Sequence, residues 1–297
     1  MDVAVGFEPG GVGGGDAHVS ETLGPNVSFF CVADGFGPSG RTGPVATFAL
    51  STMREFLRRK LRNAGTNERA LAPSHVRALL LAALELANAR LFELNGSTAD
   101  FVANGASVTA ALVVGEHAFV GHVGDARAYL LRLGRLEILT VDDAMTLDAV
   151  PSMTIAAGQR PRRRLLWRSL GTQAKLEASI AHVELLPCDR LVLCTDGFHR
   201  TIGTEELGLA LADDSKAGDA VARLLQIVRA RGIRQNATLV IARDLLAAGP
   251  DYATAAPIRW LQIGLAIVLA AAIGAWCVLE RPAWIPPLQT TQQQATR

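Results

Sequence analysis

The sequence predicts an α+β sandwich, because two long helices near its start are followed by a run of short strands and then by more helix and strand. Apolar residues make up 49% of the 297 residues and charged residues 19%, a composition that excludes a disordered chain. Lys and Arg number 29 against 28 Asp and Glu, and the resulting net charge of +1 argues against a protein organised around nucleic acid.

The first half of the chain supplies one strand and two helices. Residues 27–33 (VSFFCVA) form a short apolar run that is typical of a buried strand. Residues 44–63 and 75–95 carry apolar side chains at helical spacing, which predicts two long helices.

Strand-like runs follow closely in the middle of the chain, at residues 107–114, 117–123, 126–132 and 136–140. Glu116 and the Leu133–Gly134 pair fall at the turns between these runs, which predicts an antiparallel meander. The remaining predicted elements are a strand at 191–194, a helix at 219–230 and a strand at 237–243.

The mean hydropathy of +0.24 is high, and its apolar excess is concentrated near the C-terminus. Residues 260–279 (WLQIGLAIVLAAAIGAWCVL) would span about 30 Å as a helix, the thickness of a bilayer core. A buried core helix is the alternative, but a helix apolar on all faces and followed by a polar tail has little to pack against. We therefore expect a domain at 1–245, a linker at 246–257, a transmembrane helix at 258–280 and a short polar tail at 281–297.

Basic residues set the expected topology of this span. Arg231, Arg234, Arg243 and Arg259 precede it, whereas Arg281 alone closely follows it, so the positive-inside bias favours a cytoplasmic N-terminal domain. The N-terminus has neither a basic n-region nor an apolar h-region, and the four cysteines lie far apart, as expected in a reducing compartment. We expect a single-pass protein of the inner (cytoplasmic) membrane that contacts lipid through this helix.

Three aspartates follow apolar strands at turns that contain glycine: Asp34 in CVADGFG, Asp125 in VGDARAYL and Asp196 in LCTDGFH. Carboxylates at strand ends can project into one cleft, and hard cations prefer oxygen ligands. Asp-Gly is also a common turn dipeptide, which would explain any one of the three alone. The three together favour a metal site.

Longer motifs contain these aspartates. VADGFGPSGRTG, GHVGDARAYLLRLGRLEILTVDD, RRRLLWRSLGT and LVLCTDGFHRTI occur in that order, and the closing stretch is RQNATLVIARD. In these motifs the chain resembles the metal-dependent protein phosphatases of type 2C, the PPM family, and their bacterial members most closely. The resemblance covers residues 3–243, and it implies the four-layer α/β/β/α sandwich of that family.

The resemblance also implies a role for each matching residue. Asp34 would bridge two divalent ions, Mn²⁺ or Mg²⁺, the Gly35 carbonyl would bind one of them, and Asp196 would ligate the first ion. Asp125 and Asp196 would hold the third ion of bacterial members, and Asp16 would help to order metal-bound water. Asp34 and Asp196 are thus the expected catalytic residues, in a signalling hydrolase that removes phosphate from serine or threonine of proteins phosphorylated by a kinase.

The sequence departs from the family pattern at three positions. Phe36 stands where eukaryotic members have a His proposed as general acid, which bacterial relatives often lack. Gly11 replaces an Arg that binds substrate phosphate, a change worth roughly 1.5–3 kcal/mol. Gln235 replaces a metal-binding Asp, which should weaken the centre about 10–100-fold. These departures leave a second hypothesis open: a catalytically impaired module that binds phosphoprotein or another partner.

Several neighbouring features have plainer interpretations. The stretch 10–15 (GGVGGG) indicates a flexible loop, and 162–164 (RRR) a solvated loop, with replacement of the missing phosphate-binding Arg as its alternative. His199 is interpreted as a surface loop residue. Arg127 alternates with Asp125 along a strand, so these two side chains should share a face and could pair.

Overall fold

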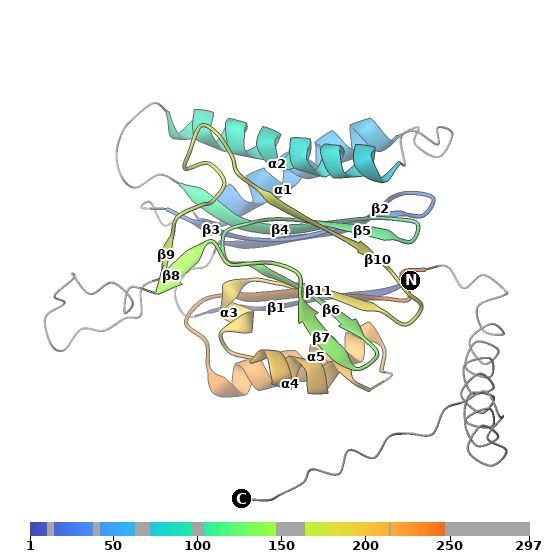
Figure 1. Cartoon of the computed structure of the whole chain (residues 1–297). Coiled ribbons are helices and arrows are strands. Elements are labelled where there is room, and N and C mark those ends of the chain that lie inside the picture. Colours follow the sequence, from blue (N-terminus) through green and yellow to red (C-terminus); the bar gives the residue numbers. More distant parts are fainter. Residues whose placement is uncertain are drawn as a thin grey trace, which may run out of the picture. The chain divides into compact units, whose positions relative to one another are not determined.

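The computed structural model describes residues 1–10, 15–37, 42–62, 72–96, 104–146, 164–213 and 215–246. The chain divides into two compact units, residues 1–247 and 248–297, and the first of these contains all the elements described below. Within the described residues, two five-stranded antiparallel sheets form the centre of this unit, and helices cover the outer face of each (Figure 1).

The strands divide between the two sheets as follows. One sheet contains, in spatial order, β1 (Asp2–Glu8), β12 (Ala237–Arg243), β11 (Arg190–Cys194), β6 (Arg127–Arg132) and β7 (Arg135–Ile138). The other contains β10 (Ser179–Glu184), β5 (His117–Val123), β4 (Gly105–Val114), β3 (Val27–Phe36) and β2 (Asp16–Gly24). A separate two-stranded pair is formed by β8 (Ala144–Thr146) and β9 (Arg164–Leu166).

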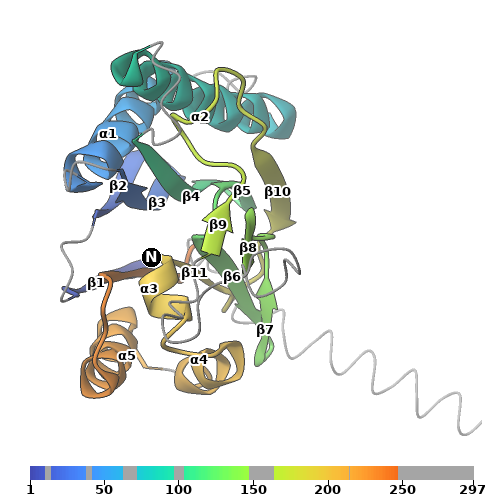
Figure 2. The ribbon, with the colours of Figure 1, turned by 90° about the vertical axis from the view of Figure 1, so that its left-hand side faces the viewer.

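The helices complete four layers. They are α1 (Thr42–Leu61), α2 (Pro73–Asn95), α3 (Asp196–His199), α4 (Thr204–Leu211) and α5 (Ala217–Arg231). In Figure 2, α1 and α2 lie over the sheet of β2–β5, whereas α4 and α5 lie over the sheet of β1 and β11. The predicted α+β sandwich is therefore confirmed, with the layer order α/β/β/α.

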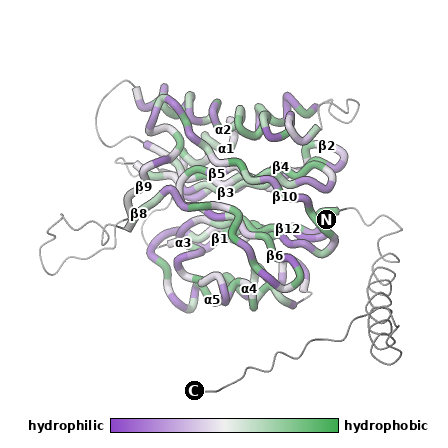
Figure 3. Tube along the Cα trace, in the orientation of Figure 1, coloured by the Kyte–Doolittle hydropathy of each residue, from purple (hydrophilic) through white to green (hydrophobic). Residues whose placement is uncertain are grey.

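Strand β3 shows how the sequence produces this layering. Its side chains alternate between two buried clusters: Phe29 and Cys31 pack under α1 and α2, whereas Phe30 and Val32 pack between the sheets. A strand buried on both faces needs apolar residues at every position, which is why this stretch reads as one continuous apolar run. Figure 3 shows the same pattern, with hydrophobic segments gathered on the strands between the helical layers.

The predicted meander over residues 107–140 is wrong. β4 pairs with β5 and β6 pairs with β7, but β5 and β6 belong to different sheets. The chain crosses from one sheet to the other at Gly124, which has a φ of +103° and lies so close to Ser107 that a Cβ there would be 2.4 Å from its Oγ. The Ser107 hydroxyl accepts hydrogen bonds from the backbone N–H groups of Asp125 and Ala126, each at 2.8 Å. Asp125 is thus held at the crossover between the sheets.

The predicted membrane segment lies outside the described residues, together with the tail and most of the linker. Among the helices that the structure describes, none is both long and apolar enough to cross a membrane.

Candidate metal centre

Asp16 and Asp34 lie side by side on neighbouring strands. β2 and β3 pair antiparallel with Asp16 directly opposite Asp34, and Asp34 in turn lies opposite Ser107 of β4. The Gly35 N–H donates to the Gly15 carbonyl at 3.0 Å, which continues the pairing past the two carboxylates. The predicted pair of acidic residues is therefore brought together by strand register.

The Asp16 carboxylate also joins this sheet to the other one. Its Oδ2 accepts hydrogen bonds from Thr195 Oγ1 at 2.7 Å and from Thr238 Oγ1 at 2.5 Å. Thr195 follows β11 and Thr238 lies on β12, and the Thr238 N–H donates to Thr195 Oγ1 at 3.0 Å. This threonine pair was missed by the sequence analysis, although Thr195 directly precedes the predicted ligand Asp196.

Asp196 is positioned by the glycine that follows it. A Cβ on Gly197 would lie 2.0 Å from the backbone oxygen of Asn236, so only glycine allows this close approach. The Asn236 side chain in turn accepts the Gly10 N–H at 2.8 Å. The approach places Gly197, which directly follows Asp196 at the start of α3, against the backbone of Asn236 and Gln235.

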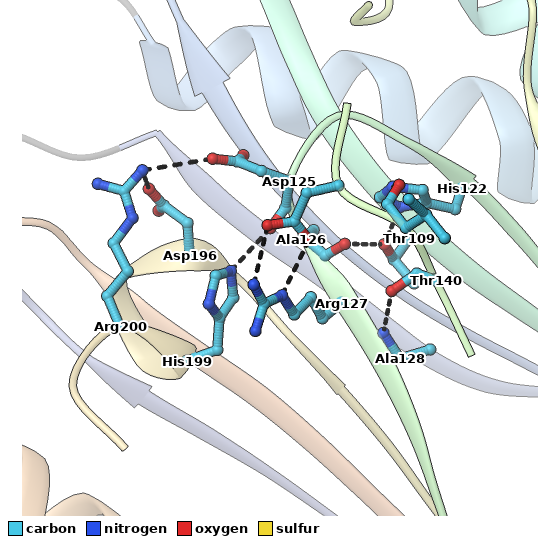
Figure 4. Close-up of polar contacts among 12 residues, drawn as sticks. Thr109, His122, Asp125, Ala126, Arg127, Ala128, Thr140, Asp196, His199 and Arg200 are labelled. Carbon is cyan, nitrogen blue, oxygen red and sulfur yellow. Dashed lines mark hydrogen bonds and ion pairs between the residues drawn. The ribbon is translucent and has the colours of Figure 1, made fainter. Parts of the chain in front are cut away.

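His199 fixes the backbone at Asp125, contrary to its interpretation as a surface loop residue. It is 7% exposed, and its Nε2 lies 2.8 Å from the Asp125 carbonyl oxygen (Figure 4). Arg127 forms a two-pronged ion pair with Asp142, at 2.9 Å for both nitrogens. One partner of Asp125 is a residue that the sequence analysis did not single out.

That residue is Arg200, which follows α3. Its Nη2 lies 3.1 Å from Asp196 Oδ2 and 3.4 Å from Asp125 Oδ2 (Figure 4). Its Nη1 lies 3.5 Å from Gln235 Oε1. The signal in the sequence was its spacing of four residues from Asp196, which places the two on one side of a helical turn.

The carboxylates of this centre destabilise one another's charge. Burial raises the pKa of Asp34 well above its usual value, and the negative charges of Asp196, Asp16 and Asp125 raise it further. Burial also raises the pKa of Asp16, an effect that the hydrogen bonds from Thr238 and Thr195 oppose. A divalent cation would relieve this repulsion.

The donor set fits a hard cation, although it is not a closed cage. Within the described part of the chain, no group of three or more His, Cys, Asp or Glu side chains forms a ready metal site. Four carboxylates whose charges interact are nevertheless the oxygen donors that Mn²⁺ and Mg²⁺ prefer, and Mg²⁺ in particular retains several water ligands in proteins. Asp16, Asp34, Asp125 and Asp196 would hold such ions, with Gln235 beside them.

A groove of about 430 Å³ lies beside Asp16. Phe7 of β1, His18 of β2 and Arg54 of α1 are among the residues that line it. Gly11, Arg162 and Arg163, which concern the missing phosphate-binding Arg, fall outside the described residues.

Known proteins resemble this chain in sequence and in fold. A family model described as "Protein phosphatase 2C" matches residues 14–240. The serine/threonine phosphatase stp of Listeria monocytogenes serotype 4b is 27% identical over 231 residues, which cover 76% of this chain and 88% of stp. The structure of the PPM Ser-Thr phosphatase MsPP from Mycobacterium smegmatis in complex with cacodylate is 27% identical, with a TM-score of 0.63 and coverage of 83% of this chain and 99% of that one. The catalytic domain of PstP in complex with two manganese ions shares the fold at 23% identity, with a TM-score of 0.63 and coverage of 80% and 96%.

The raised pKa of Asp34 predicts how the metal-free protein responds to pH. A carboxyl whose folded-state pKa is raised contributes stability at low pH and loses it as the pH rises through that pKa. Asp34→Asn removes the charge, so in EDTA at about pH 8 it should raise the melting temperature by about 3 °C or more, and by less at about pH 5.

Asp213→Asn is the matched control, because hydrogen bonding to Ser215 lowers the pKa of that exposed carboxyl. It should give no such rise in a thermal melt monitored by circular dichroism. An Asp34→Asn protein that melts no higher than the wild type at about pH 8 would contradict the repulsion inferred for this centre.

Proposed function

The chain belongs to the protein phosphatase 2C family, and from this we propose that it hydrolyses phosphoserine and phosphothreonine in protein substrates with the help of Mn²⁺ or Mg²⁺. The observation that carries the proposal is the convergence of Asp16, Asp34, Asp125 and Asp196 from four separate segments at one edge of the sandwich. The curated relatives that share most of the chain are serine/threonine phosphatases.

Each residue of the centre has a distinct task in this proposal. Bound divalent ions would supply acidified water and neutralise charge on the phosphate. Asp34 and Asp196 would hold those ions, and the threonine bonds would keep Asp16 in one orientation toward solvent water. His199 would keep Asp125 in place through its backbone carbonyl. Such positioning matters because small displacements of ligands weaken a metal site.

The groove beside Asp16 would receive the polypeptide around the phosphorylated residue. Phe7 is 45% exposed there and offers an apolar contact, whereas Arg54 offers positive charge. We expect such a groove to receive an extended loop of a protein substrate.

A second candidate function, a catalytically impaired module that binds phosphoprotein, is favoured by one observation. Gln235 brings no charge to the centre, and its amide oxygen faces Arg200 rather than a carboxylate. If this arrangement has replaced metal binding, the same fold would recognise a phosphorylated partner without hydrolysing it.

We further propose that residues 258–280 anchor the chain in the inner membrane with residues 1–257 in the cytoplasm. The supporting observations are the apolar segment 260–279 and the excess of Arg before it.

The catalytic assignment predicts a loss of function without a loss of fold. Asp34→Ala and Asp196→Ala should each lower manganese-dependent hydrolysis of p-nitrophenyl phosphate by about 100-fold or more, because each removes a ligand carboxylate. Circular dichroism should remain that of the wild type, and Asp213→Ala, which alters an exposed carboxylate paired with Arg223, should keep full turnover. Full manganese-dependent turnover in either active-site variant would show that the centre is assigned wrongly.

Gln235→Asp distinguishes a weakened enzyme from a binding module. A carboxylate at this position should raise activity about tenfold, chiefly at low manganese, because it adds a negative charge where ion occupancy limits the rate. Gln235→Glu, which moves the charge by one methylene, is the matched control and should gain less. If calorimetry detects no manganese in the wild type or in Gln235→Asp, and neither hydrolyses p-nitrophenyl phosphate, the enzyme hypothesis is wrong and the binding-module hypothesis stands.

The anchor predicts where the protein is found in the cell. The full chain should stay in the membrane fraction after an alkaline carbonate wash, which strips proteins held only by charge. A chain ending at residue 257 should move to the soluble fraction with its activity intact. Recovery of the full chain in the soluble fraction would rule the anchor out.

A further inference from the structure

Arg200 occupies the space between two of the predicted metal-binding carboxylates. One nitrogen of its guanidinium, Nη2, contacts both Asp196 Oδ2 at 3.1 Å and Asp125 Oδ2 at 3.4 Å. The other, Nη1, faces the amide oxygen of Gln235 at 3.5 Å. Figure 4 shows the Arg200 side chain reaching toward Asp125 and Asp196 from the end of α3.

The local fold directs this side chain inward. The Arg200 N–H donates to the Asp196 carbonyl at 3.0 Å, which closes the turn of α3 and places Arg200 over Asp196. The two carboxylates are almost fully buried, with side-chain exposures of 6% for Asp125 and 5% for Asp196, whereas that of Arg200 is 35%. The partly exposed guanidinium thus contacts two carboxylates that are buried and cannot reorient toward the solvent.

We propose that the Arg200 guanidinium acts as a built-in cation, so that a divalent ion can bridge Asp125 and Asp196 only by displacing it. The inference rests on the metal-dependent activity proposed above, and it concerns one position of that centre. A guanidinium and a divalent ion that contact the same carboxylate oxygens compete for them and repel each other, so each weakens the binding of the other.

The proposal predicts different affinities for the ions that the centre can hold. Asp16 and Asp34 lie on β2 and β3, and the contacts described for Arg200 are with Asp125, Asp196 and Gln235. An ion held chiefly by Asp34 should therefore bind with little competition, whereas one between Asp125 and Asp196 should bind weakly. The wild type should accordingly show fewer or weaker manganese sites than a variant without the guanidinium.

The test counts manganese sites on the full-length protein. Isothermal calorimetry and electron paramagnetic resonance of free Mn²⁺ would be applied to the wild type, Arg200→Ala and Arg200→Lys. Arg200→Ala should gain one site or tighten the weakest site by about tenfold, because the competing charge is gone. Arg200→Lys keeps the charge without the planar fork, and should fall between the two.

Two further variants locate the effect. Asp125→Asn combined with Arg200→Ala should lose the added site, because one of its two carboxylates is neutralised. Arg229→Ala removes an exposed arginine whose described ion pair is with Glu8 and not with one of the four carboxylates, and its manganese binding should equal that of the wild type.

Melting in EDTA gives a readout that needs neither metal nor activity. Arg200→Ala should melt at a lower temperature than Arg229→Ala in EDTA, because it leaves Asp125 and Asp196 without their cation, and saturating Mn²⁺ should reverse that order.

Two results would overturn the proposal while leaving the phosphatase activity in place. One is an active enzyme whose manganese sites are the same in number and affinity with and without Arg200. The other is a rise in KM for p-nitrophenyl phosphate in Arg200→Ala with manganese binding unchanged, which would make Arg200 a phosphate ligand. If neither the wild type nor any variant binds manganese or hydrolyses p-nitrophenyl phosphate, the proposed function itself fails, and this inference with it.

Discussion

The carboxylate of Asp16 is the point at which the two sheets are tied together beside the candidate metal centre. It belongs to β2 of one sheet and accepts hydrogen bonds from Thr195 and Thr238 of the other. Bonds to a charged acceptor are stronger than neutral ones, at about 1.5–3 kcal/mol each, so the pair holds the ends of β2, β11 and β12 in a fixed relation. Asp34 lies opposite Asp16, and Asp196 follows Thr195, so the same contact connects the segments that carry these two acidic residues.

The centre brings several carboxylates together in a buried place, where their negative charges are unfavourable. The fold remains stable because neighbouring hydrogen-bond donors and a cation partly compensate these charges. The threonine hydroxyls stabilise Asp16, and the Arg200 guanidinium lies between Asp125 and Asp196. The negative charge of Asp34 is compensated least, since each of its three acidic neighbours raises its pKa. This residue is thus the one whose charge would be stabilised most by a bound cation.

The elements that could be predicted are those whose hydrophobic pattern in the sequence is compatible with only one kind of secondary structure. β3, β5, β12, α1 and α2 were found because they are buried on both faces or along a regular stripe. β2 and β10 were missed because edge strands alternate polar and apolar residues too weakly to stand out. The prediction of a meander was wrong for a different reason. Period-two alternation predicts a strand but not the sheet to which it belongs, and the chain crosses between the sheets at Gly124, beside Ser107. The acidic residues of the site were predictable from their motifs, whereas the contacts of His199 and Arg200 depend on how α3 packs against the crossover.

Gln235 and Arg200 change the charge of the centre in the same direction. Relative to a site with a carboxylate at position 235 and a neutral residue at position 200, the glutamine removes one negative charge and the arginine adds one positive charge. The two side chains also meet, with Oε1 of Gln235 3.5 Å from Nη1 of Arg200. A carboxylate at 235 would draw the guanidinium toward itself and away from Asp125, so the two positions are coupled and their effects on ion binding should not add. The neutral amide therefore leaves Arg200 directed at the Asp125–Asp196 pair, and the departure at position 235 helps to decide which cation, the guanidinium or a metal ion, occupies that pair.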